Sequence, residues 1–248
     1  MRSTIRISIA LLFITVLGEQ CSTQKSVDLV IPPCFPTAIA TTSTGVSSTI
    51  VYTYNSSNLV TATKTTTTTA GQTAITDVTY AYDGDGNIIS ASESIGTGSI
   101  GTTSYTYNTN KNLAEETHTT GGILESRVTY HYNSTQQLIS VDYTLFAGAG
   151  SSTSTSTYNY PTPVGRNPTT ITSSSGSTTT YTYDTKPNPL KVLFVSTQPD
   201  NNITKVTITA GGSAANTTTY TYQYDNNGFP TARTGSNGET KAYTYFCK

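Results

Sequence analysis

Short stretches of this chain alternate strictly between apolar or aromatic residues and small polar residues. In Val78–Tyr82 and in Val128–Tyr132, a valine and two tyrosines occupy every second position. Threonine, alanine or histidine fills the positions between them. A period of two places the valine and both tyrosines on one face of a β-strand. No window shows the sustained 3.6-residue period of an amphipathic helix, so the pattern predicts an all-β protein.

A second run follows each tyrosine pair. In "QQLISVDYTLF", the alternation predicts that Ile139, Val141, Tyr143 and Leu145 share one face of a strand. Turn-forming residues separate the two runs, so each unit is a strand, a tight turn, a strand and a loop.

The tyrosine pair is an internal repeat that recurs roughly every 25 residues and is usually followed by Asn or Asp. The tyrosines that we assign to the core of the repeat are Tyr52, Tyr54, Tyr80, Tyr82, Tyr105, Tyr107, Tyr130, Tyr132, Tyr181, Tyr183, Tyr222 and Tyr224. Similar pairs occur at Tyr158 and Tyr243. The repeats predict about 14 to 16 antiparallel strands. So many strands favour one large curled sheet or a closed up-and-down barrel, with tyrosine, valine, isoleucine and leucine inside and threonine, serine and lysine outside.

The segment "DGDGN" between Tyr82 and Ile88 raises the question of a cation site. Asp83, Asp85 and Asn87 match the first alternate positions of a helix-loop-helix calcium loop. The sixth position is Ile88 instead of Gly, and the twelfth is Ser94 instead of Glu. Asp-Gly and Gly-Asn are strong hairpin formers, so we interpret the segment as a plain turn, with an adventitious weak cation site as the alternative.

These repeats resemble a known group of sequences. "YAYDGDGNIIS", "YTYDTKPNPL" and "YQYDNNGFPTARTGSNGETKAYTY" are similar to the YD repeats of Rhs-type bacterial surface proteins. Because its first residues also have the pattern of an export signal, the chain more closely resembles exported Gram-negative lipoproteins of unknown function. That resemblance implies a porin-like antiparallel β architecture, and it brings no catalytic residues. The units at Tyr158 and Tyr220 depart from the pattern, with Pro161 and an extra tyrosine.

The N-terminus predicts export. Residues 1–20 hold two arginines and then an apolar run that is too short to span a membrane, which is typical of a signal peptide. Cys21 follows directly, so we expect it to carry a lipid, although Glu19 and Gln20 depart from the usual lipoprotein signal and ordinary cleavage remains open. Residues 21–45 are rich in Ser, Thr and Pro and predict a tether, and residues 46–248 predict the repeat domain.

Three cysteines are present in the 248 residues. If Cys21 carries a lipid, Cys34 and Cys247 remain as candidates for a disulfide in an oxidising compartment, and two unpaired thiols are the alternative. No cysteine lies at metal-ligand spacing from another cysteine or a histidine, so we predict no metal site and no cofactor.

Composition narrows the function classes. Threonine makes up about a fifth of the chain, and charged residues only 11%. A net charge of −1 gives no electrostatic reason to expect nucleic acid as a partner. His118 and His131 are the two histidines, and Glu115 and Glu116 are neighbours that a strand would point to opposite faces.

We therefore predict no enzyme. The expected function is a structural or ligand-binding protein of the cell envelope, at the outer membrane or cell surface and anchored by its lipid, with a surface glycan or another envelope protein as partner. The alternatives are a periplasmic or secreted location, an outer-membrane pore, whose apolar face would contact lipid, and a secreted hydrolase.

Overall fold

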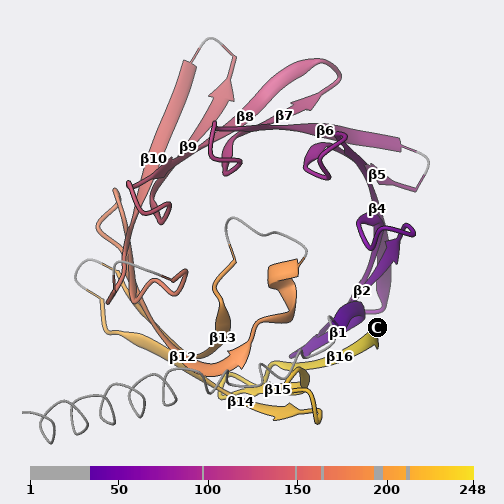
Figure 1. The fold of residues 1–248 in the computed structure, drawn as a ribbon, viewed down its shortest axis with the longest axis vertical. Helices are drawn as coiled ribbons and strands as arrows, with labels where there is room; N and C mark the ends of the chain where they lie inside the picture. Colours follow the sequence, from indigo (N-terminus) through magenta and orange to yellow (C-terminus); the bar gives the residue numbers. More distant parts are fainter. Residues whose placement is uncertain (1–33, 97, 149, 163–164, 193–197, 211–212) are drawn as a thin grey trace, which may run out of the picture. The chain divides into compact units, whose positions relative to one another are not determined.

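The computed structural model describes residues 34–96, 98–148, 150–162, 165–192, 198–210 and 213–248. Strands β1 to β16 form a closed antiparallel barrel in which neighbours along the chain are neighbours in the sheet. β1 pairs with β16 and closes the ring (Figure 1). The all-β class and the closed form of the architecture are thus confirmed. Among the described residues, no helix is long and apolar enough to cross a membrane.

The first eight strands are β1 Cys34–Ser43, β2 Val46–Tyr54, β3 Val60–Thr69, β4 Gln72–Tyr82, β5 Ile88–Ile95, β6 Gly98–Tyr107, β7 Leu113–Thr120 and β8 Ile123–Tyr132. The other strands are β9 Leu138–Ala147, β10 Gly150–Asn159, β11 Thr170–Ser173, β12 Thr178–Pro187, β13 Asn201–Thr209, β14 Asn216–Tyr224, β15 Pro230–Gly235 and β16 Thr240–Cys247. One 3₁₀ helix, η1 (Pro189–Val192), lies between β12 and β13.

The Asn or Asp that follows five of the tyrosine pairs builds the turn at one end of the barrel, which we name the Asx end. At Asp83, the carboxylate Oδ1 accepts hydrogen bonds from the backbone N–H groups of Asp85 and Asn87, at 3.0 and 2.8 Å. Gly86 takes the positive φ of 85° that the turn requires. The same bonds recur at the residues Asn55, Asn108, Asn133 and Asp225. The "DGDGN" segment is therefore a hairpin turn.

Shorter turns connect the strands at the opposite end. Ala70 and Gly71 have φ of 50° and 81°, and Gly121 and Gly122 have φ of 58° and 81°. Two successive positive φ angles define the type I′ turn, whose twist matches that of a two-stranded ribbon. Glycine is well suited to these positions because it adopts positive φ without a steric penalty.

Consecutive hairpins are interlocked by tyrosine hydroxyls. Tyr82 in β4 donates to the backbone carbonyl of Val60, the first residue of β3, at 2.5 Å. Equivalent bonds of 2.7 to 3.0 Å join Tyr54 to Pro36, Tyr107 to Ile88, Tyr132 to Leu113, Tyr183 to Pro168, Tyr222 to Ile203 and Tyr245 to Pro230. Each bond satisfies a backbone carbonyl next to a β-bulge or a turn. Each repeat therefore stabilises the hairpin that precedes it.

The tyrosine-bearing face is the interior of the barrel, which we name the lumen. Thr63, Val60 and Ala91, all buried, pair directly with Tyr52, Tyr54 and Tyr80 and therefore share their face. The connection from β12 to β13 places η1 inside the ring of strands, where it contacts β1 (Figure 1). The lumen is therefore lined by aromatic side chains and partly occupied by the chain itself.

Two sequence predictions need correction. The tether predicted for residues 21–45 overlaps β1, which begins at Cys34; Pro36 is accommodated because the register of β1 and β16 shifts between Pro36 and Ala38. Residues 1–33, including the predicted signal peptide and Cys21, lie outside the described residues. The prediction that Ile139 shares the face of Val141 is also wrong, because a bulge leaves Ile139 unpaired and puts Leu138 opposite Tyr132.

Replacing Asn108 by alanine is expected to lower the free energy of unfolding by about 1 kcal/mol, because the side chain satisfies two backbone N–H groups of its turn. Asn110 lies in the same turn, and its side chain is exposed. Urea denaturation of Asn108→Ala and Asn110→Ala compares the two. An equal loss in both variants would contradict the role of the Asn108 side chain.

Candidate functional site

The lumen carries two rings of tyrosines. All twelve predicted repeat tyrosines are half-buried on this face. The first tyrosine of each pair forms one ring and the second tyrosine forms the other, and Tyr243 of β16 continues the first ring across the seam between β1 and β16 toward Tyr52 of β2. Burial, with a smaller contribution from Tyr80, raises the pKa of Tyr52 to about 12. Neutral aromatic rings, with polar edges, therefore form much of the inner surface.

A pocket of about 170 Å³ lies in this aromatic wall at the Asx end of β10 and β12. Tyr158 and Tyr160 line it from β10 and the residue that follows, and Tyr181 and Tyr183 line it from β12. The rings of Tyr181 and Tyr183 stack with their centroids 6.3 Å apart. The remaining lining residues are Asn112, Gln136, Leu138, Arg166, Pro168, Ile171, Gln198, Pro199 and Ile203. Aromatic surface and a few converging polar groups are the usual makeup of a small-molecule site.

The buried amide of Gln137, supported by Asn133, holds the β10–β11 loop at this pocket. The Nε2 of Gln137, which is 6% exposed, donates to the backbone carbonyls of Thr162 and Gly165, both at 3.0 Å. Asn133 donates in turn to Oε1 of Gln137 at 3.1 Å. The Tyr183 hydroxyl bonds to Pro168 at the far end of the loop. Hydrogen bonds from side chains of the barrel thus hold this rim of the pocket in place.

The β12–β13 loop forms the opposite rim and is tied to the first loop. The N–H of Arg166 donates to Oδ2 of Asp200 at 2.9 Å. Asn167 donates from Nδ2 to Oδ1 of Asn201 at 2.7 Å and accepts from the Asn201 N–H at 3.2 Å. Lys191 of η1 pairs with Oδ1 of Asp200 at 2.5 Å. The contacts of Arg166 and Asn167 bring together residues that are 34 positions apart in the sequence.

Arg166 is the charged residue of the pocket lining, which includes no carboxylate from the described parts of the chain. Its Nη1 atom is buried and has no hydrogen-bond partner among the described residues. Arg166 also opposes the effect of burial on Tyr160, whose pKa nevertheless rises to about 12. The charge of the guanidinium therefore affects the Tyr160 hydroxyl in the pocket wall, and its Nη1 donor is available to a ligand.

Other ionisable groups face the lumen away from the pocket. Glu116 of β7 accepts a 2.6 Å hydrogen bond from the hydroxyl of Tyr130. Burial raises the pKa of Glu116, although this hydrogen bond acts in the opposite direction. On β15, the guanidinium of Arg233 lies 4.3 Å from the centroid of the Tyr220 ring and pairs with Glu239. Burial and the nearby Arg233 lower the pKa of Lys241.

As the pH rises from below 4.5, the free energy of unfolding is expected to fall less in the Glu116→Gln variant than in the wild type. Because the folded-state pKa is raised above its usual value of 4.5, the folded chain holds this proton more firmly than the unfolded chain. This contribution is fully present below the pKa of the unfolded chain and is lost as the pH rises through the folded-state pKa. Urea midpoints measured across this range test it. A Glu115→Gln variant that flattened the profile equally would contradict the assignment.

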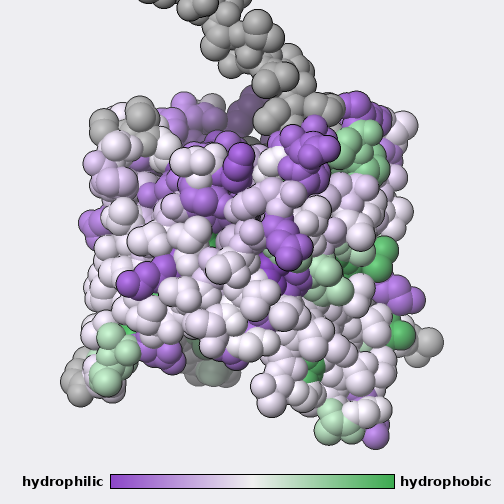
Figure 2. Space-filling model, turned by 90° about the horizontal axis from the view of Figure 1, so that it is seen from below, coloured by the Kyte–Doolittle hydropathy of each residue, from purple (hydrophilic) through white to green (hydrophobic). Residues whose placement is uncertain are grey.

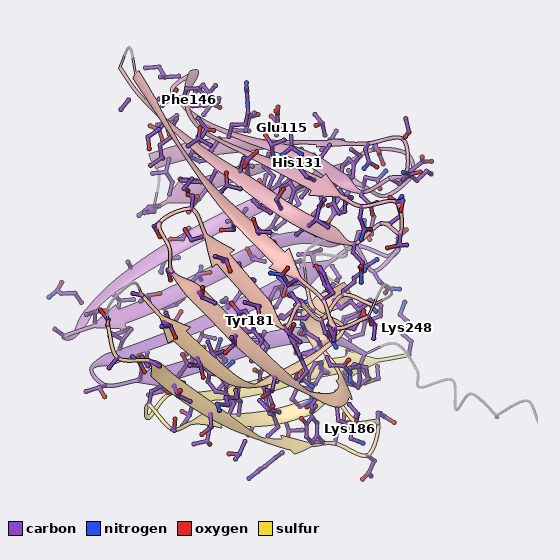
Figure 3. All side chains as sticks on the ribbon, turned by 90° about the vertical axis from the view of Figure 1, so that its left-hand side faces the viewer. Glu115, His131, Phe146, Tyr181, Lys186 and Lys248 are labelled. Atoms are coloured by element: carbon purple, nitrogen blue, oxygen red, sulfur yellow. A yellow bond between two sulfur atoms is a disulfide. The ribbon has the colours of Figure 1, made fainter. Side chains whose placement is uncertain are left out.

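The outer face of the barrel is polar. The middle residue of every tyrosine pair is exposed on it: Thr53, Ala81, Thr106, His131, Asn159, Thr182, Thr221 and Thr244. His131 pairs with Asp142 at 2.9 Å, and Glu115 pairs with Arg127 at 3.3 Å. Figure 3 shows Glu115 and His131 on one wall, between Phe146 near one end of the barrel and Lys186 near the other. The face shown in Figure 2 is mostly pale to purple, with small separate green patches.

On this outer face, threonine side chains on neighbouring strands form hydroxyl pairs. The hydroxyls of Thr144 and Thr153 lie 2.8 Å apart across β9 and β10, and those of Thr207 and Thr217 lie 3.0 Å apart across β13 and β14. Cross-strand hydroxyl pairs stabilise exposed sheet surface without apolar side chains. The predicted division into tyrosine inside and threonine outside therefore holds for these pairs. Thr63 and Lys241 are exceptions that face the lumen, and Val51 and Ile75 are apolar exceptions on the outer face.

The carboxylates considered for catalysis are separated by the wall. Glu115 meets Arg127 on the outer face, whereas Glu116 meets Tyr130 in the lumen. His118 accepts or donates a 3.1 Å hydrogen bond with Thr103, and His131 lies on the outer face. Within the described part of the chain, no group of three or more His, Cys, Asp or Glu is placed to hold a metal ion.

Cys34 and Cys247, the predicted pair, form a disulfide between β1 and β16. It lies at the first residue pair of the strand seam that closes the barrel. The pocket, by contrast, was not predicted from sequence. Tyr181 and Tyr183 were assigned to the repeat core, but Arg166 and Gln198 lie in loops without a motif, and no sequence signal indicates that they meet.

No protein-family model matches the sequence. A search of curated proteins finds no match either. Solved structures with a similar chain path include a porin-like protein from Bacteroides uniformis ATCC 8492, with 16% identity, 85% of this chain and 98% of that chain covered, and a TM-score of 0.44. A porin-like protein from Bacteroides vulgatus ATCC 8482 has 10% identity, coverage of 86% and 98%, and a TM-score of 0.33.

The Tc holotoxin pore of Photorhabdus luminescens is also similar, with 14% identity, 75% of this chain and 13% of that chain covered, and a TM-score of 0.34. At such identities and scores, these likenesses describe β architecture alone, and no functional argument rests on them. The chain is therefore a 16-strand antiparallel barrel that resembles porin-like proteins of Bacteroides in its architecture.

Proposed function

We propose that the protein is a non-catalytic, exported β-barrel of the cell envelope that binds a glycan in its tyrosine-lined pocket. The observation that carries this proposal is the wall formed by Tyr158, Tyr160, Tyr181 and Tyr183, with the amides of Asn112 and Gln136 at its edge. Sugar rings stack their C–H faces on aromatic rings, and their hydroxyls bond to amide groups.

The size of the pocket supports a small ligand or one end of a longer chain. At about 170 Å³ it is smaller than the roughly 300–1,000 Å³ of sites for drug-sized molecules. A single sugar unit of an oligosaccharide suits this volume. The stacked tyrosines are held by the barrel wall, so little side-chain entropy is lost when a ligand binds.

Export is supported by the disulfide, because such bonds persist in oxidising compartments. A lipid on Cys21 would anchor the barrel to a membrane through residues 21–33, and the proposed location is the outer membrane or cell surface. Mass spectrometry of the mature N-terminus tests both parts of this proposal. A mature chain with an unmodified thiol at position 21 would contradict the anchor and leave the export proposal standing.

The polar outer face weighs against a pore whose wall contacts lipid. A lipid-facing strand surface is apolar, and charged side chains near the middle of a bilayer cost about 2–4 kcal/mol each. Here the ion pair between Glu115 and Arg127 lies on that surface. Migration in detergent gels before and after heating tests the alternative, since a membrane barrel is expected to be heat-modifiable and conductive in lipid bilayers.

Calorimetric titration with a panel of neutral and acidic oligosaccharides tests glycan binding. We expect Tyr158→Ala and Tyr181→Ala to weaken binding at least tenfold, which corresponds to about 1.4 kcal/mol. The matched control is Tyr143→Ala, because Tyr143 is 40% exposed and does not line the pocket. Absence of saccharide binding, or an equal loss in the control, would contradict the proposal; binding of peptides instead would indicate a protein partner.

A further inference from the structure

The guanidinium of Arg166 gives the pocket a chemical preference. An arginine side chain stays charged at any physiological pH and offers five N–H donors in a fixed plane. Its Nη1 is buried without a hydrogen-bond partner among the described residues. A buried donor without a partner carries a free-energy cost, which is larger when the donor belongs to a charged group. A ligand that supplies an acceptor at this place would recover that cost.

The charges around Arg166 leave its positive charge in excess. Within the described ranges, no Asp or Glu lines the pocket. Asp200, the acid bonded to this segment, already pairs through Oδ1 with Lys191 and accepts through Oδ2 from the backbone N–H of Arg166. Those contacts lower the pKa of Asp200 against the effect of its own burial. The three side chains Arg166, Lys191 and Asp200 therefore sum to a net positive charge beside the tyrosine wall.

The backbone at Arg166 is also held in place before any ligand arrives. Gln137 fixes the carbonyl of Gly165, and the Tyr183 hydroxyl fixes that of Pro168, so both neighbours of the Arg166–Asn167 segment are anchored to the barrel. The Asn167–Asn201 bonds connect this segment to the other rim. The guanidinium therefore extends from an anchored stretch of backbone, and its planar fork is suited to bidentate bonds with a planar carboxylate.

We propose that the pocket selects sugars that carry a carboxylate, of the hexuronic acid class, and that the guanidinium of Arg166 receives the carboxylate while the ring stacks on Tyr158 and Tyr181. This inference rests on the proposed glycan-binding function and specifies its ligand. The carboxylate and the aromatic wall act together: the tyrosines bind the sugar face, and Arg166 distinguishes an acidic sugar from a neutral one.

Calorimetry with an oligouronide and with a neutral oligosaccharide of the same length and linkage tests the preference. We expect the wild type to bind the oligouronide at least tenfold more tightly. Arg166→Gln should lower the affinity for the oligouronide at least tenfold, to about that for the neutral sugar, and a circular dichroism spectrum that matches the wild type shows that the variant is folded. Arg166→Lys should retain part of the preference, because it keeps the charge and loses the planar fork.

The possible outcomes separate the two proposals. If neutral and acidic sugars bind equally, the inference fails and the glycan-binding function stands. If the wild type prefers the oligouronide and Arg166→Gln keeps that preference, Arg166 is not the receiving group and the inference fails. If inorganic sulfate alone binds as tightly as the oligouronide, the pocket is a simple anion site and both proposals fail. Absence of binding to any sugar overturns both as well.

Discussion

Replacing Cys34 and Cys247 by serine is expected to lower the free energy of unfolding of the barrel by about 3–5 kcal/mol. The two cysteines are 213 positions apart, so their bond encloses almost the whole described chain. In the chain-entropy account, a loop of that length removes a large part of the conformational freedom of the unfolded state, and the loss grows with the logarithm of loop length. The bond also joins the strands whose pairing closes the barrel.

Guanidinium denaturation monitored by circular dichroism checks this result. The oxidised wild type should unfold at a higher denaturant concentration than Cys34→Ser/Cys247→Ser, and the reduced wild type should match the double variant. Hydrogen exchange should accelerate most at the β1–β16 seam, since only that pairing loses its covalent closure. Equal midpoints for oxidised and reduced protein would contradict a stabilising role for the disulfide.

Local features of the fold could be predicted because they depend on neighbouring residues. Tyr80 and Tyr82 share a face through the two-residue period of a strand, and Asp83 builds a turn from its own backbone. The number of strands follows from counting such units. The sequence predicted either a curled sheet or a closed barrel, because the strands of both forms show the same alternation of apolar and polar residues.

Features that depend on contacts between distant segments could not be predicted. The hydroxyl of Tyr82 finds its acceptor at Val60, in the previous hairpin, and nothing in the Tyr-x-Tyr pattern identifies that partner. Arg166 reaches the pocket because Asp200 and Asn201 hold its loop from 34 positions away. Its sequence context, "PVGRNP", has no motif. The proposed ligand-binding residues therefore lie where the repeat is interrupted.

The same limit applies to strand register, where a single inserted residue changes which side chain is buried. Leu138 is 6% exposed and lies opposite Tyr132, whereas Ile139 is 39% exposed at the bulge. Strict alternation from Val141 would have buried Ile139 instead. The bulge follows the Asx turn because Asn133 accepts from the N–H groups of Thr135 and Gln137, which fixes the chain one residue before β9 begins.

This register predicts opposite outcomes for two neighbouring residues. Leu138→Ala is expected to lower the free energy of unfolding by about 2–5 kcal/mol, because it leaves a cavity under the tyrosine wall. Ile139→Ala should cost less than about 1 kcal/mol, since most surface substitutions have small effects. Urea denaturation of both variants, with the slope checked for a common unfolded state, measures the difference. If Ile139→Ala proved the more destabilising, Ile139 and not Leu138 would be the buried residue. The alternation would then continue unbroken through β9, and the bulge opposite Tyr132 would be contradicted.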